Sequence, residues 1–290
     1  MVAICKVCGS KSNRVTNYRK ISKKTALKLF LFKIFNFKED YSDSTFNGKI
    51  ILCNDCKYGV MQNPPNEADL KKYYEKKYWD KRLPTVEIKQ SKSQNLRSKY
   101  QYRFIKNYIK PLMNFSILEI GAGPAFSSIL IRKKIKNVKI SIDVCETGEQ
   151  FNEHYKNNYI NRVAHFFPFD SNKKYDYMHC SHWLEHVHDL DSTVKNLKSL
   201  LNDNGLIFIE VPNTEHFYFD QSSIQINHIP HIQFFSISSL KLVFEKFSFK
   251  TLEIKECGET REEYYKGISS PIFGNNLKGK WIRALFKKQK

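Results

Sequence analysis

Four cysteines near the start of the chain form two Cys-x-x-Cys pairs, Cys5 with Cys8 and Cys53 with Cys56. Each pair can present two thiolates to one ion, and two pairs complete the tetrahedral set that zinc prefers in structural sites. The 44 residues between Cys8 and Cys53 place a long insertion inside such a zinc ribbon. Because four thiolates leave no open coordination position, we predict a structural zinc ion. The alternatives are four free thiols or a redox pair, and the redox pair lacks its usual βαβ context.

A glycine-rich turn is the second group of residues that could do chemistry. Gly121 and Gly123 follow an apolar stretch and allow a tight turn that a ligand can approach closely. A helix is predicted over 125–134, and the next strand, 138–142, ends at Asp143. A strand, a Gly-x-Gly turn, a helix and a carboxylate about 20 residues on are typical of a nucleoside-cofactor site. In such a site Asp143 would accept the ribose hydroxyls.

The residues around this turn favour one cofactor over another. A dinucleotide site prefers a third glycine, where this chain has Phe126. Glu119, two residues before Gly121, could hold a cationic amino group. S-adenosylmethionine carries an ammonium and a sulfonium but no phosphate, so it suits these residues better than a dinucleotide. An ordinary glycine turn in an α/β domain is the remaining alternative.

Three blocks of sequence resemble one family. The stretch 118–123 resembles the first motif of class I S-adenosylmethionine-dependent methyltransferases, and 175–187, which contains Leu-Glu-His, resembles their fourth-strand motif. The stretch 205–213 resembles their fifth strand and the loop after it. The resemblance implies an α/β fold with a doubly wound, mostly parallel, seven-stranded Rossmann-like sheet. The expected cofactor contacts are Glu119, Gly121, Ala122, Gly123, Asp143 and His182.

The elements that must position these residues are predicted as follows. Further strands are expected at 163–167, 175–180, within 205–213 and at 249–257, with helices at 95–110, 191–201 and 240–247. We expect four segments: a zinc-ribbon module with a basic insertion (1–62), a linker or helical cover (63–94), the methyltransferase domain (95–260) and a basic C-terminal tail (261–290).

Charge is concentrated in the first part of the chain. The net charge is +19, and residues 1–110 hold 25 Lys and Arg against 9 Asp and Glu. This excess indicates an anionic partner, such as a phosphorylated substrate, a membrane surface or nucleic acid, or else a solvated lysine-rich surface. The basic, aromatic segment 20–38 could lie on a membrane or pack in a core. The absence of an apolar run long enough to span a bilayer and of a signal-peptide pattern, together with the Cys pairs, predicts a cytoplasmic protein.

Three histidines are candidates for the base that methyl transfer to a hydroxyl requires. Methyl transfer from a sulfonium is an in-line displacement, so the acceptor must be aligned and, for a hydroxyl, deprotonated. His182 follows the predicted fourth strand, and His228 and His231 follow the fifth. We favour His231, since 227–236 resembles a His-x-x-Tyr/Phe-Phe-Ser segment of related methyltransferases, including sugar C-methyltransferases with an N-terminal zinc module. Only His231 matches the catalytic run of those enzymes, which argues against C-methylation and leaves O-methylation open.

The sequence therefore predicts a methyltransferase that uses S-adenosylmethionine and carries zinc. The resemblance implies O-methylation of a sugar, a nucleotide-sugar or another phosphorylated small molecule in surface-polysaccharide synthesis, with peripheral contact to an anionic membrane surface as a further possibility. A methyltransferase that acts on RNA or protein is the first alternative, which the basic first part would favour. A non-catalytic zinc-ribbon binding protein is the second.

Overall fold

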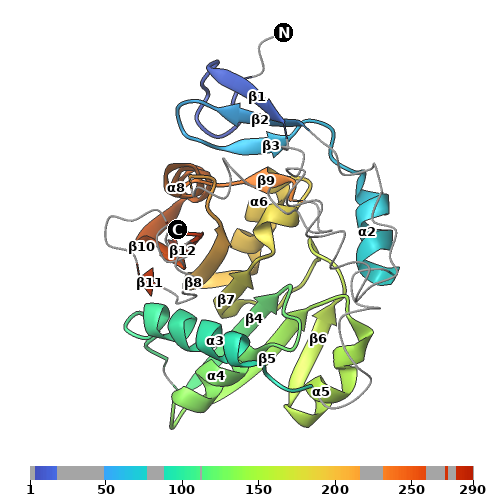
Figure 1. The fold of residues 1–290 in the computed structure, drawn as a ribbon. Helices are drawn as coiled ribbons and strands as arrows, with labels where there is room; N and C mark the ends of the chain where they lie inside the picture. The colour runs from blue at the N-terminus through green and yellow to red at the C-terminus, as the bar shows by residue number, and fades with distance from the viewer. Residues whose placement is uncertain are drawn as a thin grey trace.

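The computed structural model describes residues 4–17, 49–76, 88–111, 113–215, 231–258, 272–273 and 279–289. These residues form two β-sheets with helices around the larger one (Figure 1). The basic segment 20–38 and His228, both singled out in the sequence, lie outside the described residues.

The larger sheet is built on a parallel core. Its order is β11-β10-β12-β8-β7-β4-β5-β6. The strands are β4 (Asn114–Ile120), β5 (Lys139–Cys145), β6 (Ile160–Ala164), β7 (Tyr175–Ser181), β8 (Leu201–Pro212), β10 (Phe249–Gly258), the two-residue β11 (Ile272–Phe273) and β12 (Trp281–Lys288). Strands β6, β5, β4, β7 and β8 pair in parallel, whereas β12 is antiparallel to both β8 and β10. The predicted mostly parallel, Rossmann-like sheet is confirmed.

The predicted basic tail is wrong in its second half. Residues 281–288 form β12, which lies inside the sheet between β8 and β10 rather than beyond the domain. Ile282, Ala284, Leu285 and Phe286 are buried. The lysines at the end of β12 made it resemble a basic tail in the sequence. Its apolar centre does not alternate with polar residues, because both faces of the strand are covered.

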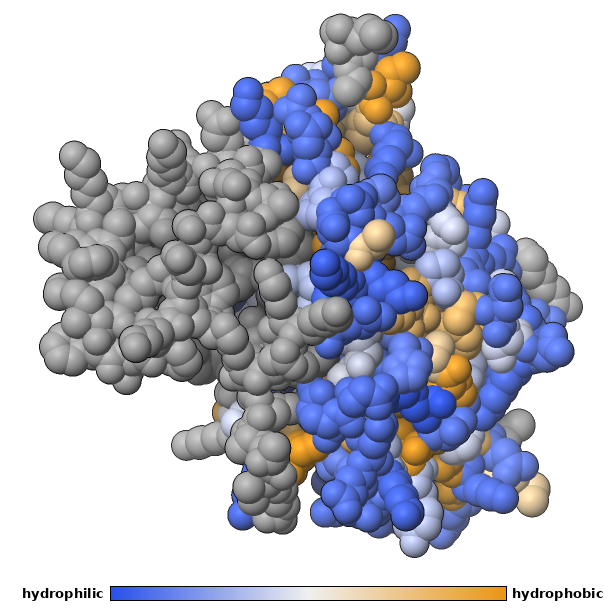
Figure 2. Space-filling view, turned by 90° about the vertical axis from the view of Figure 1, so that its right-hand side faces the viewer, coloured by the Kyte–Doolittle hydropathy of each residue, from blue (hydrophilic) through white to orange (hydrophobic). Residues whose placement is uncertain are grey.

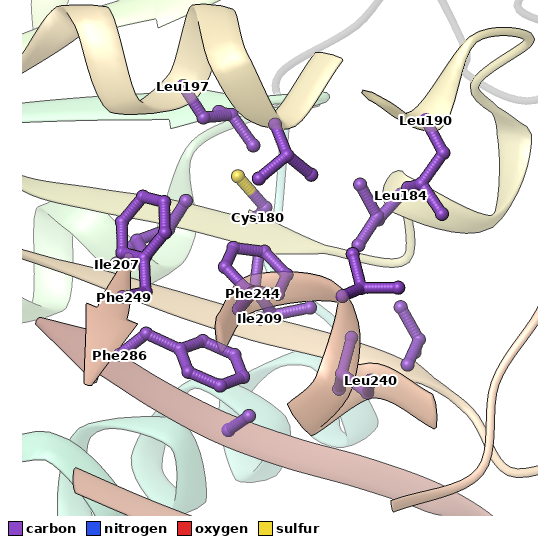
Figure 3. Close-up of a cluster of buried hydrophobic side chains, with 14 of the residues drawn as sticks. Cys180, Leu184, Leu190, Leu197, Ile207, Ile209, Leu240, Phe244, Phe249 and Phe286 are labelled. Carbon is purple, nitrogen blue, oxygen red and sulfur yellow. The ribbon is translucent and has the colours of Figure 1, made fainter. Parts of the chain in front are cut away.

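Helices cover both faces of the larger sheet. They are α3 (Lys92–Ile105), α4 (Phe126–Lys134), η2 (Glu149–Phe151), α5 (Asn152–Asn157), η3 (Leu184–His186), α6 (Leu190–Leu200) and α8 (Ile237–Lys246), with α2 (Glu67–Lys76) to one side (Figure 1). One apolar cluster joins α6 and α8 to the sheet through residues such as Leu197, Phe244 and Phe286 (Figure 3). A second joins α3, α4 and α5 to the other face. None of the helices in the described part of the chain has the length and apolar character that crossing a bilayer requires.

Several helices begin at polar side chains that accept backbone N–H groups. Ser91 and Gln94 form a reciprocal capping box at α3, and Asp189 accepts the Ser192 N–H at α6. These caps explain why α3 starts before the predicted residue 95. The strand predicted at 163–167 instead runs from Ile160 to Ala164 as β6.

The smaller sheet joins strands from the N-terminal module to a strand from much later in the chain. It consists of β1 (Asn13–Asn17), β2 (Lys49–Cys53), β3 (Gly59–Met61) and β9 (Gln233–Phe234), all antiparallel. Strand β9 comes from the segment before α8, so the cysteine-bearing module shares a sheet with the main domain. The module therefore lies directly above β9 and α6 (Figure 1).

The described surface is mainly polar. Figure 2 shows hydrophilic side chains over most of the described part of one face, interrupted by small apolar patches. Among described residues, the large apolar side chains that are exposed lie far apart in the sequence, for example Ile4, Met113 and Tyr159.

Candidate functional site

The glycine turn lies at the carboxyl ends of the parallel strands. Gly121 and Gly123 have φ angles of 64° and 49°, in the left-handed region that favours glycine. The Gly121 N–H donates to the Cys145 carbonyl across the end of β5, at 2.9 Å. A Cβ on Gly121 would lie 2.9 Å from the Trp183 ring. The turn therefore needs glycine both for its backbone angle and for the close packing of Trp183.

Asp143 does not lie where the sequence predicted it. Strand β5 continues two residues past it, to Cys145, so Asp143 is inside the strand and 3% exposed. Its carboxylate accepts hydrogen bonds from the Lys173 ammonium at 2.6 Å and the Tyr175 hydroxyl at 2.8 Å. Tyr175 starts β7, at the opposite end of the sheet from the turn. These contacts engage the Asp143 carboxylate within the protein, and its contact with the cofactor ribose stays a prediction.

Glu146 occupies the position that had been assigned to Asp143. It is the first residue after β5, is 4% exposed, and its Oε2 accepts the Gly123 N–H at 2.7 Å. Its Oε1 accepts the Gly148 N–H at 2.8 Å. The carboxylate thus joins the glycine turn to the end of β5, where the ligands of open α/β sheets bind. The available sequence signal was the continuing apolar run of Val144 and Cys145, which extends the strand past Asp143.

Glu119 and Ala122 flank the same turn but differ in what they contact. The Glu119 carboxylate accepts a hydrogen bond at 3.1 Å from the N–H of Ser128, the third residue of α4. The helix has no side-chain cap of its own, so Glu119 supplies its N-terminal acceptor. Burial raises the pKa of the Glu119 carboxyl to about 7. Ala122 is 8% exposed, and its carbonyl accepts the Ala125 N–H within the turn.

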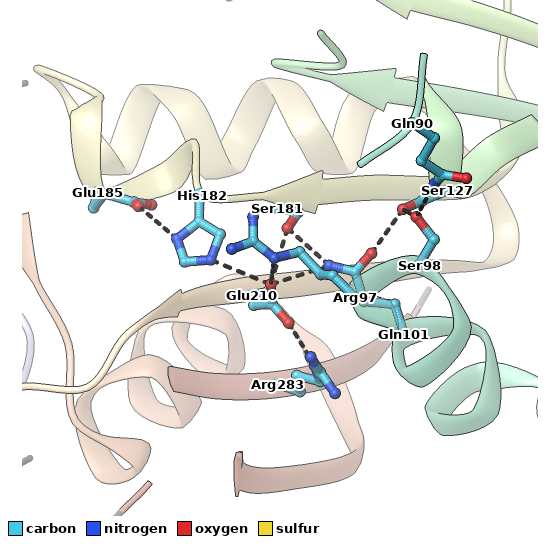
Figure 4. A network of polar contacts seen from close by, with 10 residues as sticks. All are labelled: Gln90, Arg97, Ser98, Gln101, Ser127, Ser181, His182, Glu185, Glu210 and Arg283. Carbon is cyan, nitrogen blue, oxygen red and sulfur yellow. Dashed lines mark hydrogen bonds and ion pairs between the residues drawn. The ribbon is translucent and has the colours of Figure 1, made fainter. Parts of the chain in front are cut away.

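His182 lies between two carboxylates just past the end of β7 (Figure 4). Its Nδ1 is 3.4 Å from Glu185 Oε1 and its Nε2 is 3.2 Å from Glu210 Oε1. Burial alone would lower the pKa of the imidazole, but these two contacts raise it above its usual value. The backbone of His182 has φ 53°, an unusual angle for a non-glycine residue and one that often marks functional sites.

Glu210 is the centre of a buried polar network that the sequence analysis missed. It ion-pairs with Arg283 of β12 and accepts the Gln101 amide N–H at 3.0 Å, with Arg97 at 3.9 Å (Figure 4). Burial alone would raise the pKa of the Glu210 carboxyl, but the Arg283 charge and His182 hold it well below its usual range. An ionised carboxylate is therefore fixed beside His182. A glutamate inside the apolar stretch 206–211 was the sequence signal for it.

His231 meets a different set of partners from those expected. Its ring lies 4.8 Å, between centroids, from the ring of His186, and the two share the neighbourhood of Glu185. Burial, together with the nearby His186, lowers the pKa of His231 to about 3. The imidazole is therefore neutral over the physiological range. The structure brings His231 and His182 to the two sides of Glu185.

The four predicted zinc ligands come together in the N-terminal module. Cys5 Sγ is 3.7 Å from Cys56 Sγ, and Cys8 Sγ is 3.5 Å from Cys53 Sγ. Tetrahedral zinc with Zn–S bonds of about 2.3 Å requires sulfur atoms roughly 3.8 Å apart. The arrangement and the thiolate donor set fit a zinc ion. The four sulfur atoms would complete its tetrahedral coordination.

The N-terminal module is hydrogen-bonded to the segments that follow β7 and β8 and to the segment around β9. The Ser236 hydroxyl donates to the Cys56 carbonyl at 2.7 Å, and the Thr214 hydroxyl donates to the Lys57 carbonyl at 3.2 Å. The buried Tyr58 hydroxyl donates to the Gln233 side chain, whose amide in turn donates to the Val187 carbonyl at 2.9 Å. The cysteine cluster thus supports the segment that carries His231.

Comparisons with known proteins place this geometry among related folds. A family model described as a methyltransferase domain matches residues 71–254. A possible histamine N-methyltransferase from Thermotoga maritima, described as S-adenosylmethionine-dependent, has TM-score 0.50 and 14% identity over 68% of this chain and 90% of its own. A putative sarcosine dimethylglycine methyltransferase from Galdieria sulphuraria has TM-score 0.51 and 15% identity over 68% and 86%.

A third similar structure is that of a chain within a complex. A chain in the complex between the Haloferax volcanii Trm112 methyltransferase activator and the putative methyltransferase has TM-score 0.51 and 11% identity, covering 69% of this chain and 93% of that one. At these identities the solved structures show a shared fold alone. No curated protein matches the sequence.

Proposed function

Because the chain belongs to the methyltransferase domain family and is an S-adenosylmethionine-dependent methyltransferase, we propose that it methylates a hydroxyl oxygen of a small polar acceptor. A sugar, a nucleotide-sugar or another phosphorylated compound is the acceptor class that we favour. The observation that carries this proposal is His182, held between Glu185 and Glu210 at the carboxyl end of β7. A hydroxyl acceptor must lose a proton, and His182 is the side chain that would accept it.

The cofactor is proposed to lie over the glycine turn, with Glu146 holding the ribose hydroxyls. Support comes from its place directly after β5 and from its bond to the Gly123 N–H. Gly121, Ala122 and Gly123 would line the cofactor through their backbone, and Trp183 would close the site beside Gly121. Glu119 has an indirect role here, because its carboxylate holds the first turn of α4.

His182 is proposed as the base in preference to His231. Carboxylates on both sides stabilise the imidazolium that forms when the ring takes a proton, which makes the neutral ring a stronger acceptor. The separations of 3.4 and 3.2 Å exceed those of tight charge-assisted bonds, about 2.7–2.9 Å. A bound hydroxyl can therefore compete for the ring. His231, with a pKa of about 3, is a weak proton acceptor by comparison.

An anionic acceptor finds positive charge near this base. Arg97 is 3.9 Å from Glu210, and its side chain is 42% exposed, so it can reach a bound phosphate. Its guanidinium also lies over the Trp281 ring, which keeps it near the site. We place the reaction in the cytoplasm, because paired cysteines suited to zinc are typical of reducing compartments.

Substitution of the base tests the acceptor chemistry. His182→Gln should lower turnover by roughly 10²–10⁴, measured as transfer of labelled methyl from S-adenosylmethionine in a screen of nucleotide-sugar and sugar-phosphate acceptors. Cofactor affinity should change little, since His182 does not touch the glycine turn in the contacts described. His165→Gln, at an exposed histidine directly after the edge strand β6, is the control. A His182→Gln enzyme that keeps more than a third of wild-type turnover would exclude this base.

The four cysteines are proposed to hold one structural zinc ion. Their sulfur separations and the docking of their module on β9 support a role in stability rather than in chemistry. Elemental analysis of protein purified without chelator should find zinc at one equivalent for this cluster. Complete absence of a metal bound by these thiolates would contradict the assignment.

Methylation of RNA is the second candidate, because residues 1–110 hold 25 Lys and Arg against 9 Asp and Glu. Binding through phosphates would weaken steeply as salt rises. A labelled RNA that binds with a steep salt slope and accepts methyl groups would favour this candidate over a small acceptor. The membership of the methyltransferase family leaves the non-catalytic alternative without support.

A further inference from the structure

Two histidines and a glutamate meet just beyond the end of β7, away from the four cysteines. Glu185 and His186 belong to η3, and His231 precedes β9. One ligand atom from each of the three lies within 4.8 Å of the other two. We propose that Glu185, His186 and His231 bind one divalent first-row transition-metal ion, of the class of Mn²⁺, Fe²⁺, Co²⁺ or Zn²⁺.

The spacing of the three groups is close to what such an ion requires. Metal bonds of about 2.0–2.2 Å to imidazole nitrogen and carboxylate oxygen hold neighbouring ligand atoms roughly 3–4 Å apart. His186 Nε2 is already 3.7 Å from Glu185 Oε1. The remaining separations are no larger than 4.8 Å. Two imidazoles and one carboxylate form a donor set that selects ions of this class over Mg²⁺ and Ca²⁺.

The Glu185 carboxylate is the strongest sign that a ligand is expected here. The side chain is 2% exposed, and neither oxygen accepts a hydrogen bond from any described residue. Its nearest described partners are His182 Nδ1, at 3.4 Å, and His186 Nε2, at 3.7 Å. A buried carboxylate without hydrogen bonds is costly unless a cation compensates it. A metal ion would supply that charge.

The backbone around the three ligands is fixed by the smaller sheet. The Ile232 N–H, next to His231, donates to the Glu185 carbonyl at 2.8 Å, and the Met61 N–H of β3 donates to the Ile232 carbonyl at 2.9 Å. This pairing holds the His231 segment against η3 whether or not an ion is present. The ligands therefore come from two segments that the fold itself aligns, as a preorganised metal site requires.

Three protein ligands leave open coordination positions for oxygen donors. A hydroxyl, carboxylate or phosphate oxygen of the acceptor is the chemistry that would fill them, and this part of the inference rests on the proposed function. Metal binding itself does not rest on it, since it needs neither cofactor nor acceptor. The tests below measure binding alone, and cofactor affinity is measured separately, so one can fail while the other holds.

Mn²⁺ is the probe, because it prefers oxygen and nitrogen ligands over the thiolates of the cysteine cluster. Full-length protein is brought to equilibrium by dialysis against Mn²⁺, and total divalent metal is counted. We expect two equivalents per chain, the zinc ion that the cysteines retain and one Mn²⁺ ion here. Glu185→Gln and His231→Asn should each lower the count to one. His165→Asn, at an exposed histidine elsewhere on the sheet, should keep two.

A spectroscopic measurement on the unaltered protein guards against variants that fail to fold. Electron spin echo spectra of bound Mn²⁺ should show nitrogen modulation from two imidazoles. A wild-type chain that holds only one equivalent, or folded variants that still hold two, would overturn the proposal. Bound Mn²⁺ without imidazole nitrogen modulation would overturn it equally.

Discussion

Buried ionisable side chains in this protein have pKa values set by what surrounds them. Glu210 stays ionised because Arg283 and His182 contact it, whereas Glu119, with only backbone and hydroxyl partners, has a pKa of about 7. His179, inside β7, is fully buried, shares a hydrogen bond with the Tyr177 hydroxyl at 2.9 Å and stacks on Phe208 with ring centroids 4.6 Å apart. Roles at the site therefore follow from neighbours brought together from different strands.

His179 should make the folded protein sensitive to acid. Burial lowers its pKa from 6.5 to about 3, so the folded state keeps it neutral. Below pH 6.5 the unfolded chain gains a proton that the folded chain cannot bind, so stability falls as the pH is lowered toward 3. This histidine contributes at most about 1.4 kcal/mol per pH unit. Urea unfolding from pH 6 to 4 should show a shallower fall in His179→Gln than in wild type.

The control for this measurement is His165→Gln, which removes an exposed histidine. Its free energy of unfolding should fall with pH as steeply as that of the wild type. An unchanged slope in His179→Gln would mean that His179 is protonated in the folded protein, against its complete burial.

The glycine turn could be predicted from sequence, but the carboxylate beside it could not. Gly121 and Gly123 have a local backbone reason to be glycine, and that reason is visible in the sequence. Asp143 has two partners, the exposed Lys173 and the buried Tyr175, that are 30 and 32 residues away. Such contacts decide that β5 continues to Cys145 and that Glu146, not Asp143, reaches the turn.

At the scale of elements, β12 shows where apolar patterns mislead. Residues 259–280 separate it in the sequence from β10, yet it pairs with β8 from Trp281 to Lys287. Parallel strands such as β4 and β7 could be predicted, because their apolar runs end in turns. A closing strand that ends in lysines has no such signal, and its place depends on partners far away in the chain.

Removing β12 should unfold the domain. A chain that stops after residue 278 loses three large buried apolar side chains, Ile282, Leu285 and Phe286, each worth about 1.5–3 kcal/mol, and breaks the Glu210–Arg283 pair. The sum reaches the typical total stability of about 5–15 kcal/mol. Thermal circular dichroism should show no cooperative transition. A chain that stops after residue 288 is the control and should melt as the full chain does.

The join between the two sheets depends on Gln233. Its side chain is 1% exposed and bonds to Tyr58 and to the Val187 carbonyl. Gln233→Ala would leave these buried groups without partners and should cost about 1–3 kcal/mol, measured by chemical unfolding. Gln62→Ala, at an exposed glutamine of the same module, should cost little. Equal stability of the two variants would show that the join adds nothing to stability.

The whole molecule combines a sheet that carries the glycine turn with a module that pairs with the segment carrying His231. The glycine turn and Glu146 lie at β4 and β5, whereas His182, Glu185 and His231 lie at β7 and β9. Among the described residues, the cysteine module pairs with the second group through β3 and β9. Cofactor binding should therefore depend on the sheet alone, and acceptor chemistry on both parts.

The placement of the cofactor is tested most directly by calorimetric titration with S-adenosylmethionine. Glu146→Gln removes a charged acceptor of the ribose hydroxyls, worth about 1.5–3 kcal/mol per bond, so its affinity should fall at least tenfold. Asp143→Asn changes a carboxylate that faces Lys173 and Tyr175, so it should lower stability and leave affinity within about threefold, since a tenfold change needs about 1.4 kcal/mol. A Glu146→Gln protein that binds as well as wild type, beside an Asp143→Asn protein that has lost affinity, would contradict this account.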